Sequence, residues 1–398
     1  MKKTIFTLLL QPIAASLASM SPIIDHQALS QKLLFADFVR KLIFGYVYQV
    51  SSLRNLAVEL QTNPVCRALG LSFTPFSTLK DGFSRFRSGH FKQLFETLLE
   101  QTCLKSVKDL DELGIFRVID GSLFPTLWQM NWTSYRKTKN AFKLHLSFEL
   151  NRMIPTEFWV SGGNSSERKF LISVLVAGIT YIADRGYFSF GLATKIIEAK
   201  ALFIMRGKDN LVYEVIEKLV IRPAEGPGCL RQVTDEIVIF KGDKNRHRLR
   251  LITFKVGGSY FRLVTNRLDL TSLKIIILYA YRWQIELFFK FMKRSLKGIH
   301  LFNHSQNGVE IQFYVLMSVA LRLLKVKQAS AELEKEEEKE AEAREKRKEK
   351  ERSPSKWIKE ITKIFYQSWK IPKKWLTVMR NSLAQPADDE LLKLLNSI

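Results

Sequence analysis

The segment 279–296, YAYRWQIELFFKFMKRSL, combines the apolar content of a buried helix with regularly spaced polar side chains. On a helix, which turns about 100° per residue, five of them fall within roughly 60–70° of one another. They are Tyr279, Arg282, Glu286, Lys290 and Lys293. Because a buried charge without a partner is costly, this polar stripe must face something polar.

Two interpretations of the stripe are open on this segment alone. In the first, Glu286 pairs with Arg282 and Lys290 at i±4 and the stripe is an internal salt-bridge ladder. In the second, Glu286 holds a cation and the basic side chains hold an anion, so the stripe lines a functional site.

Two further carboxylates, Asp120 and Asp184, end the apolar segments GIFRVID and ITYIAD, which are predicted strands. In open α/β sheets, sites form at the carboxyl edge of the strands. An Asp there is often only a turn or cap residue. If the two strands are neighbours, however, the carboxylates repel unless a cation lies between them, and Mg²⁺ prefers such oxygen ligands. With Glu286 as the third carboxylate, the set predicts a two-metal phosphoryl-transfer site.

The elements that must position these residues follow from periodicity. Three strands, a helix, a strand, a helix and a strand are expected in that order at 114–120, 141–150, 154–162, 165–178, 179–184, 189–200 and 201–207. Further β segments follow at 236–242, 248–256 and 260–266, within a β-rich block at about 208–270. An apolar helix is expected at 309–326. The pattern predicts a mixed α/β (α+β) fold.

Composition limits the partners. The chain has 398 residues, 46% of them hydrophobic, and a net charge of +23. Such a basic excess favours a polyanion, nucleic acid first and an anionic membrane surface second. Three widely spaced cysteines provide neither a disulfide framework nor a zinc pattern, which fits a reducing cytosol.

The N-terminal region reads as helical and basic, which suggests a small DNA-binding domain or a helical cap on the next domain. Its first twenty residues resemble a signal peptide, but Gln11 and Pro12 interrupt the apolar run. An amphipathic first helix is therefore the favoured interpretation, and no membrane span is expected. The tract 329–352 predicts an exposed salt-bridged helix or a linker, followed by a Trp-rich helical tail.

Four motifs, in this order, resemble the DDE transposases of bacterial insertion sequences that carry a Y-x2-R-x3-E-x6-K signature. They are Asp120-Gly121, the DRGY of 184–187, the LVTN of 263–266, and Tyr279-x2-Arg282-x3-Glu286-x6-Lys293. The resemblance covers roughly 113–325 and implies a ribonuclease H-like core with a β-rich insertion. The expected organisation is a helical N-terminal region (1–112), this catalytic domain (113–325), a charged linker or helix (326–356) and a helical tail (357–398).

The resemblance also implies roles. Asp120, Asp184 and Glu286 would hold two Mg²⁺ ions, with Mn²⁺ as a substitute. Tyr279, Arg282 and Lys293 would contact DNA phosphates. The partners would be double-stranded DNA (terminal inverted repeats and target) and a second copy of the chain in a synaptic homodimer, in the cytoplasm at the nucleoid.

Three alternatives to cut-and-paste transposition remain. One is a nuclease on the same fold that cuts without strand transfer. Another is an inactive, transposase-derived DNA-binding protein, against which the complete set of Asp120, Asp184 and Glu286 argues. The weakest is a secreted basic protein.

Overall fold

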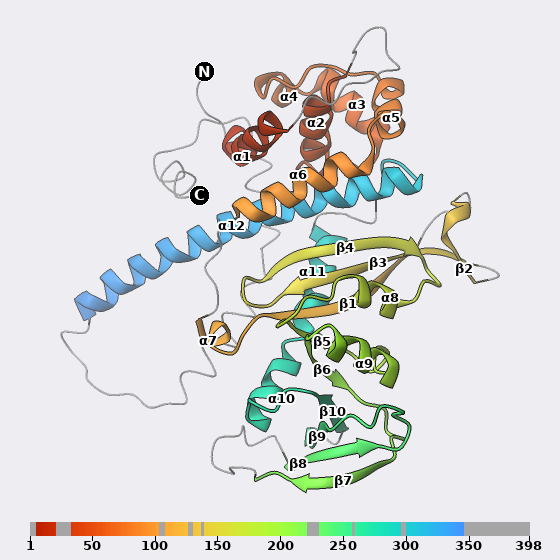
Figure 1. The fold of residues 1–398 in the computed structure, drawn as a ribbon. Helices are drawn as coiled ribbons and strands as arrows, with labels where there is room; N and C mark the ends of the chain where they lie inside the picture. The colour runs from red at the N-terminus through yellow and green to blue at the C-terminus, as the bar shows by residue number, and fades with distance from the viewer. Residues whose placement is uncertain are drawn as a thin grey trace. The chain divides into compact units, whose positions relative to one another are not determined.

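The structure is a computed structural model. In it the chain forms two compact units, a helical unit (1–105 with 288–398) and a sheet unit (106–287). It describes residues 5–20, 33–102, 108–125, 130–136, 139–220, 231–256, 259–295 and 300–345 (Figure 1). The tail 357–398 and the last part of the charged tract lie outside the described residues.

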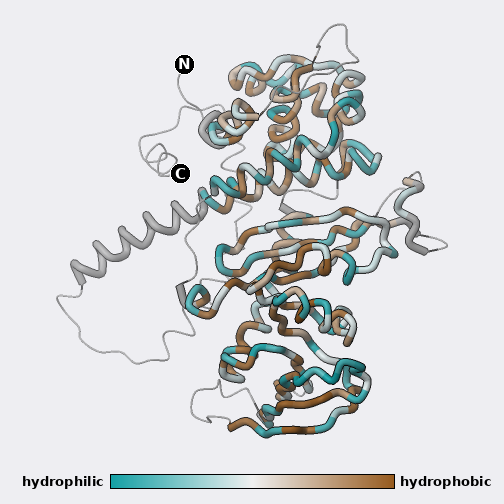
Figure 2. Tube along the Cα trace, viewed as in Figure 1, coloured by the Kyte–Doolittle hydropathy of each residue, from teal (hydrophilic) through white to brown (hydrophobic). Residues whose placement is uncertain are grey.

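Besides the helical segment 288–295, the described residues of the helical unit form six N-terminal helices and one long C-terminal helix. They are α1 (Ile5–Ser19), α2 (Phe35–Val47), α3 (Leu53–Thr62), α4 (Pro64–Ala68), α5 (Phe76–Arg85), α6 (Ser88–Gln101) and α12 (Gln306–Glu345). Local sequence starts two of them: the Ser52 hydroxyl accepts from the Asn55 amide, and the Asn63 side chain accepts from the Val65 amide. Hydrophobic and hydrophilic stretches alternate along these helices, as amphipathic packing requires (Figure 2).

The long helix α12 packs against α2, α5 and α6 (Figure 1). Near its start, the Asn307 side chain donates to the carbonyl oxygens of Phe83 and Phe86, at 2.7 and 2.9 Å. The buried Gln312 side chain accepts a hydrogen bond from Tyr46 Oη at 3.1 Å. These bonds join the N-terminal helices to α12. Helix α12 continues into the charged tract as far as Glu345.

The first helix packs against α6 and α2 and buries Leu10 and Ile13. Ser16 Oγ also donates to Gln101 Oε1 at 2.9 Å. The segment Ile5–Ser19 is thus a helix packed within the helical unit. Within the described part of the chain, no helix is both long and apolar enough to span a bilayer.

The sheet unit is built on one ten-stranded mixed sheet. Its strand order is β2-β3-β1-β5-β6-β10-β9-β8-β7, with β4 paired to β3. The strands are β1 (Phe116–Pro125), β2 (Ser134–Arg136), β3 (Lys139–Glu149), β4 (Ile154–Gly162), β5 (Thr180–Ala183), β6 (Leu202–Arg206), β7 (Tyr213–Lys218), β8 (Arg231–Phe240), β9 (Leu249–Val256) and β10 (Ser259–Thr265). The helices are α7 (Lys108–Asp111), the 3₁₀ turn η1 (Asn131–Thr133), α8 (Glu167–Ser173), α9 (Phe190–Glu198) and α10 (Ser272–Ala280).

The predicted strand and helix order from β1 to β6 is confirmed, although the short strands β2 and β7 were not predicted. The register explains where the two aspartates lie. Strand β1 pairs in parallel with β5 up to Ile119 opposite Ala183, so Asp120 and Asp184 come next at the same level of adjacent strands. Helices α8 and α9 pack on the sheet through Phe170, Leu192 and the apolar side chains around them.

The β-rich insertion continues the sheet rather than forming a separate layer. Strand β10 pairs antiparallel with β6, and β9, β8 and β7 follow outward in turn. The edge of β6 is therefore covered by the chain's own insertion.

The prediction of one continuous helix over 279–296 is wrong. Helix α10 ends at Ala280, α11 runs from Trp283 to Lys290, and a π-helical turn follows at Phe291–Ser295. Between α10 and α11 the hydrogen bonds tighten: the Arg282 amide donates to the Tyr279 carbonyl and the Gln284 amide to the Tyr281 carbonyl. Tyr279 and Glu286 thus come from different helices, and Arg282 lies in the turn between them.

Candidate active site

Asp184 and Tyr279 are in direct contact. Asp184 directly follows β5, and Tyr279 lies in the last turn of α10. Tyr279 Oη donates a hydrogen bond to Asp184 Oδ1 at 3.0 Å. Burial, and then the negative charge of Asp184, raise the pKa of Tyr279 well above its usual value, so the phenol remains a neutral donor.

Arg282 and Glu286 form an ion pair beside this contact. Arg282 Nη2 lies 2.8 Å from Glu286 Oε1, and the two side chains are 16% and 28% exposed. Burial opposes the charge on Arg282, but Tyr279, Asp184 and Glu286 act against burial, and the net effect raises its pKa. The guanidinium therefore pairs with Glu286 and also feels the negative charge of Asp184.

Asp120 lies in the same electrostatic environment. Its Oδ1 accepts from the Gly121 amide at 2.8 Å. Burial raises the pKa of Asp120 from 3.8 to about 6; the Gly121 amide and Arg282 act to lower it, and Glu167 and Glu286 act to raise it. The structure thus brings together five of the six residues that the sequence singled out, namely Asp120, Asp184, Glu286, Tyr279 and Arg282.

The sixth, Lys293, lies in the π-helical turn of the helical unit. It is partly buried, and burial lowers its pKa. Burial favours the neutral form of a lysine, whereas a nearby anion favours its charged form.

Two residues near Asp120, Lys143 and Glu167, were missed by the sequence reasoning, and Tyr187 was singled out only as part of the DRGY motif. Glu167 Oε1 accepts from Lys143 Nζ at 3.0 Å. Tyr187 is 2% exposed, and the charges of Glu167, Asp120 and Asp184 add to burial in raising its pKa. The signal for Tyr187 was the DRGY motif, and Glu167 lay near the start of the helix predicted at 165–178.

The donor chemistry suits a hard divalent cation, because the groups around Asp120 are carboxylates. As the side chains stand, the described residues hold no three carboxylate, His or Cys groups placed to bind one metal ion together. Each of these carboxylates has another partner: Asp184 accepts from Tyr279, Glu286 from Arg282, and Glu167 from Lys143.

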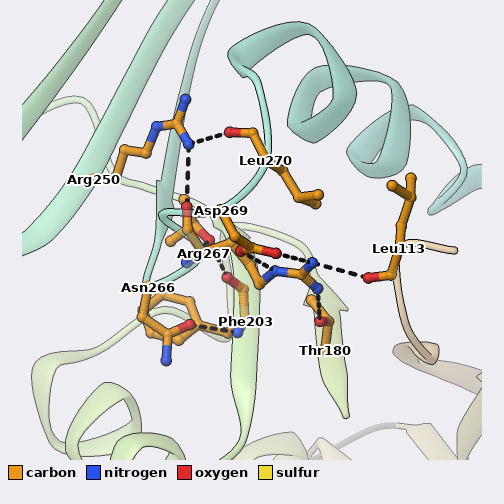
Figure 3. A network of polar contacts seen from close by, with 9 residues as sticks. Leu113, Thr180, Phe203, Arg250, Asn266, Arg267, Asp269 and Leu270 are labelled. Atoms are coloured by element: carbon orange, nitrogen blue, oxygen red, sulfur yellow. Dashed lines mark hydrogen bonds and ion pairs between the residues drawn. The ribbon is translucent and has the colours of Figure 1, made fainter. Parts of the chain in front are cut away.

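The LVTN motif and the residue after it connect the strands that carry the site (Figure 3). Asn266 Oδ1 accepts from the Phe203 amide at 2.8 Å, which joins the end of β10 to β6. The next residue, Arg267, is 4% exposed and donates to Thr180 Oγ1 at 2.7 Å and to the Leu113 carbonyl at 2.9 Å. The insertion is thereby tied to the start of the strand that carries Asp184.

Asp120→Asn is expected to stabilise the cation-free protein at alkaline pH. The folded-state pKa of about 6 lies above the ordinary 3.8, so protonation favours folding. This contribution is fully present below about pH 4 and is lost as the pH rises through 6. Because Asn is neutral throughout, the variant should gain about 1–2 kcal/mol at pH 8 and little at pH 4. Thermal melts in EDTA across this range measure it; a gain that is equal at both pH values would contradict the shifted pKa.

Two aspartates at the same level of the parallel strands β1 and β5, with a glutamate brought in from α11, form a site built on three carboxylates. The chain belongs to the DDE transposase family, since the model of the transposase DDE domain matches residues 113–323. The resemblance inferred from the four motifs is thereby confirmed.

Similar proteins carry the same description. The chain is 29% identical over 219 residues to a putative transposase, y4zB, of Sinorhizobium fredii, which covers 54% of this chain and 61% of the relative. It is 24% identical over 187 residues to a probable transposase for insertion sequence element IS5377 of Geobacillus stearothermophilus (47% and 49%). It is 25% identical over 260 residues to a putative transposase for insertion sequence element IS4SA of Synechocystis (63% and 71%). The chain thus spans less than two thirds of the first two relatives.

Proposed function

We propose that this protein is a divalent-metal-dependent DNA transposase that cleaves DNA at the ends of an insertion sequence and transfers the cut strand to a target. The observation that carries the proposal is the convergence of Asp120, Asp184 and Glu286, from β1, β5 and α11, within the matched DDE domain. The strand order β4-β3-β1-β5-β6, antiparallel and then parallel, supports a ribonuclease H-like core.

In this proposal, Asp120, Asp184 and Glu286 hold the catalytic cations through their carboxylate oxygens. Two Mg²⁺ ions, or Mn²⁺ in their place, would supply activation of the attacking hydroxyl and charge stabilisation at the leaving oxygen. Tyr279 and Arg282 donate to Asp184 and Glu286 in the cation-free protein. Once cations hold those carboxylates, the phenol and the guanidinium can turn their donors to a DNA phosphate.

The proposed partners are double-stranded DNA, as terminal repeats and target, and a second copy of the chain in the synaptic complex. The net charge of +23 supports a polyanionic partner. A cytoplasmic location at the nucleoid follows from this role.

The proposal is tested with DNA that carries the ends of the element, incubated with full-length protein and Mg²⁺. Cut ends together with strands joined to target DNA support transposition. Cut ends without joined products would support the nuclease alternative, and no cutting with intact binding would support an inactive DNA-binding protein. EDTA is the control, since it should abolish cutting and spare binding.

Lys293→Ala is expected to weaken DNA binding and to lower its salt dependence. In a plot of the logarithm of the association constant against the logarithm of the salt concentration, each phosphate contact contributes about −0.9 to the slope. Loss of one contact should therefore make the slope less negative by about 0.9. Fluorescence anisotropy with labelled end DNA at several salt concentrations measures it. Lys274→Ala, at an exposed lysine of α10, is a matched charge control. An unchanged slope in Lys293→Ala would place this lysine in an internal role.

A further inference from the structure

A fourth carboxylate, Glu167, lies against the backbone that carries Asp120. It is the first residue of α8, and its Oε1 atom would be 3.0 Å from a Cβ atom placed on Gly121, the neighbour of Asp120. Its side chain is 30% exposed and accepts from Lys143 Nζ at 3.0 Å. Any side chain at position 121 would thus crowd this carboxylate.

The position of Glu167 is fixed by the next residue along the chain. Arg168 Nε donates to the Tyr187 carbonyl at 3.0 Å, and Arg168 Nη2 donates to the Gly186 carbonyl at 3.1 Å. These two bonds tie the start of α8 to the turn that follows Asp184. The start of α8, which carries Glu167, is therefore fixed to this turn independently of the ion pair between Glu167 and Lys143.

The hydroxyl of Tyr187 provides a second, independent observation. Tyr187 is 2% exposed, and its Oη atom has no hydrogen-bond partner among the described residues. The charges of Glu167, Asp120 and Asp184 all act on this phenol. A buried hydroxyl without a partner costs on the order of 1–3 kcal/mol, so its retention beside three carboxylates points to a ligand that completes its hydrogen bonding.

We propose, on the basis of the transposase function above, that Glu167 is a fourth carboxylate of the active site and binds the divalent cation beside Asp120. In the bound state the Tyr187 hydroxyl donates to a carboxylate oxygen or a water of that cation. In the cation-free state Lys143 compensates the charge of Glu167 and competes with the cation. Glu167 and Lys143 therefore act in opposite directions on cation affinity.

An interpretation in which Glu167 only forms a structural pair with Lys143 explains less. It leaves the Tyr187 hydroxyl without a hydrogen-bond partner among the described residues. It also predicts that loss of either partner destabilises the fold to a similar extent, because the same ion pair is lost in both cases.

The test is isothermal titration of DNA-free, full-length protein with Mn²⁺ as the probe. Glu167→Gln keeps the shape and removes the charge, and is expected to weaken Mn²⁺ binding by about tenfold or more. Lys143→Met is expected to strengthen binding, because the competing ammonium is gone. Glu157→Gln is the matched control: Glu157 of β4 also pairs with a basic residue, Arg117 of β1 at 3.1 Å, and the variant should bind Mn²⁺ as the unmodified protein does.

Asp120→Asn distinguishes failure of the role proposed for Glu167 from failure of the proposed transposase metal site. If Asp120→Asn loses Mn²⁺ binding and Glu167→Gln keeps it, the role of Glu167 is overturned and the transposase site stands. If both keep it, the metal site of the proposed function is itself overturned. Should Glu167→Gln unfold, as judged by circular dichroism, Lys143→Met decides: tighter Mn²⁺ binding supports the proposal, and unchanged or weaker binding overturns it.

Discussion

A Glu286→Gln protein is expected to cleave element-end DNA about 10³-fold more slowly than the unmodified protein, while it binds the same DNA with similar affinity. Loss of one carboxylate from a two-metal site removes several kcal/mol of transition-state stabilisation, and about 4 kcal/mol corresponds to this factor. Single-turnover cleavage with Mg²⁺ measures the rate, and electrophoretic mobility shifts measure the binding.

The same variant is expected to remain folded. The Arg282–Glu286 pair is partly exposed, and the amide oxygen of the substituted side chain would still accept from the guanidinium, so the cost should stay within about 1 kcal/mol. Loss of a negative charge near Asp120 acts in the opposite direction. Thermal melts of the metal-free protein, beside the cleavage assay, decide whether Glu286 belongs to an internal salt-bridge ladder or to a functional site. A variant that is markedly less stable yet still cuts DNA would make Glu286 a structural residue only.

Asp235→Ala is expected to have the largest effect on stability, about 3–5 kcal/mol, because it leaves the Arg250 charge buried without its carboxylate. Asp235 and Arg250 are 2% and 4% exposed, and Arg250 Nε donates to Asp235 Oδ1 at 2.8 Å. Arg250 also donates to the carbonyls of Arg267 and Leu270, just before α10 (Figure 3). Urea unfolding followed by circular dichroism measures the loss.

Asp269→Ala is the matched control for this prediction. Asp269 also pairs with a buried arginine, Arg267, at 2.7 Å, but its own side chain is 63% exposed. Water can replace an exposed carboxylate, so the expected loss is about 1 kcal/mol or less. Equal losses in the two variants would show that burial of the pair does not set its contribution.

The order of strands and helices along the chain from β1 to β6 was predictable because the apolar segments of the sheet unit are short and separated by turn residues. Asp120 and Asp184 could be placed at strand ends for the same reason. Their proximity required the register, and parallel pairing of β1 with β5 cannot be read from local periodicity. The family signature supplied that missing long-range information.

The break between α10 and α11 was not predictable from the helical wheel. A wheel assumes continuous α-helical geometry, whereas the amides of Arg282 and Gln284 bond three residues back. Glu167 was missed for a different reason: its carboxylate reaches Gly121 and Lys143 across the fold. No spacing along the chain encodes such a contact.

Continuation of the sheet through the insertion has a consequence for association. Without β10, the unpaired edge of β6 would present open amide and carbonyl groups, on which a strand of another molecule could assemble. The insertion moves this open edge outward to β7. That strand carries the charged residues Glu214, Glu217 and Lys218 beside the exposed Val215 and Ile216. Charges at an outer strand discourage fibre-like growth, so the insertion makes edge-to-edge association of the sheet less favourable.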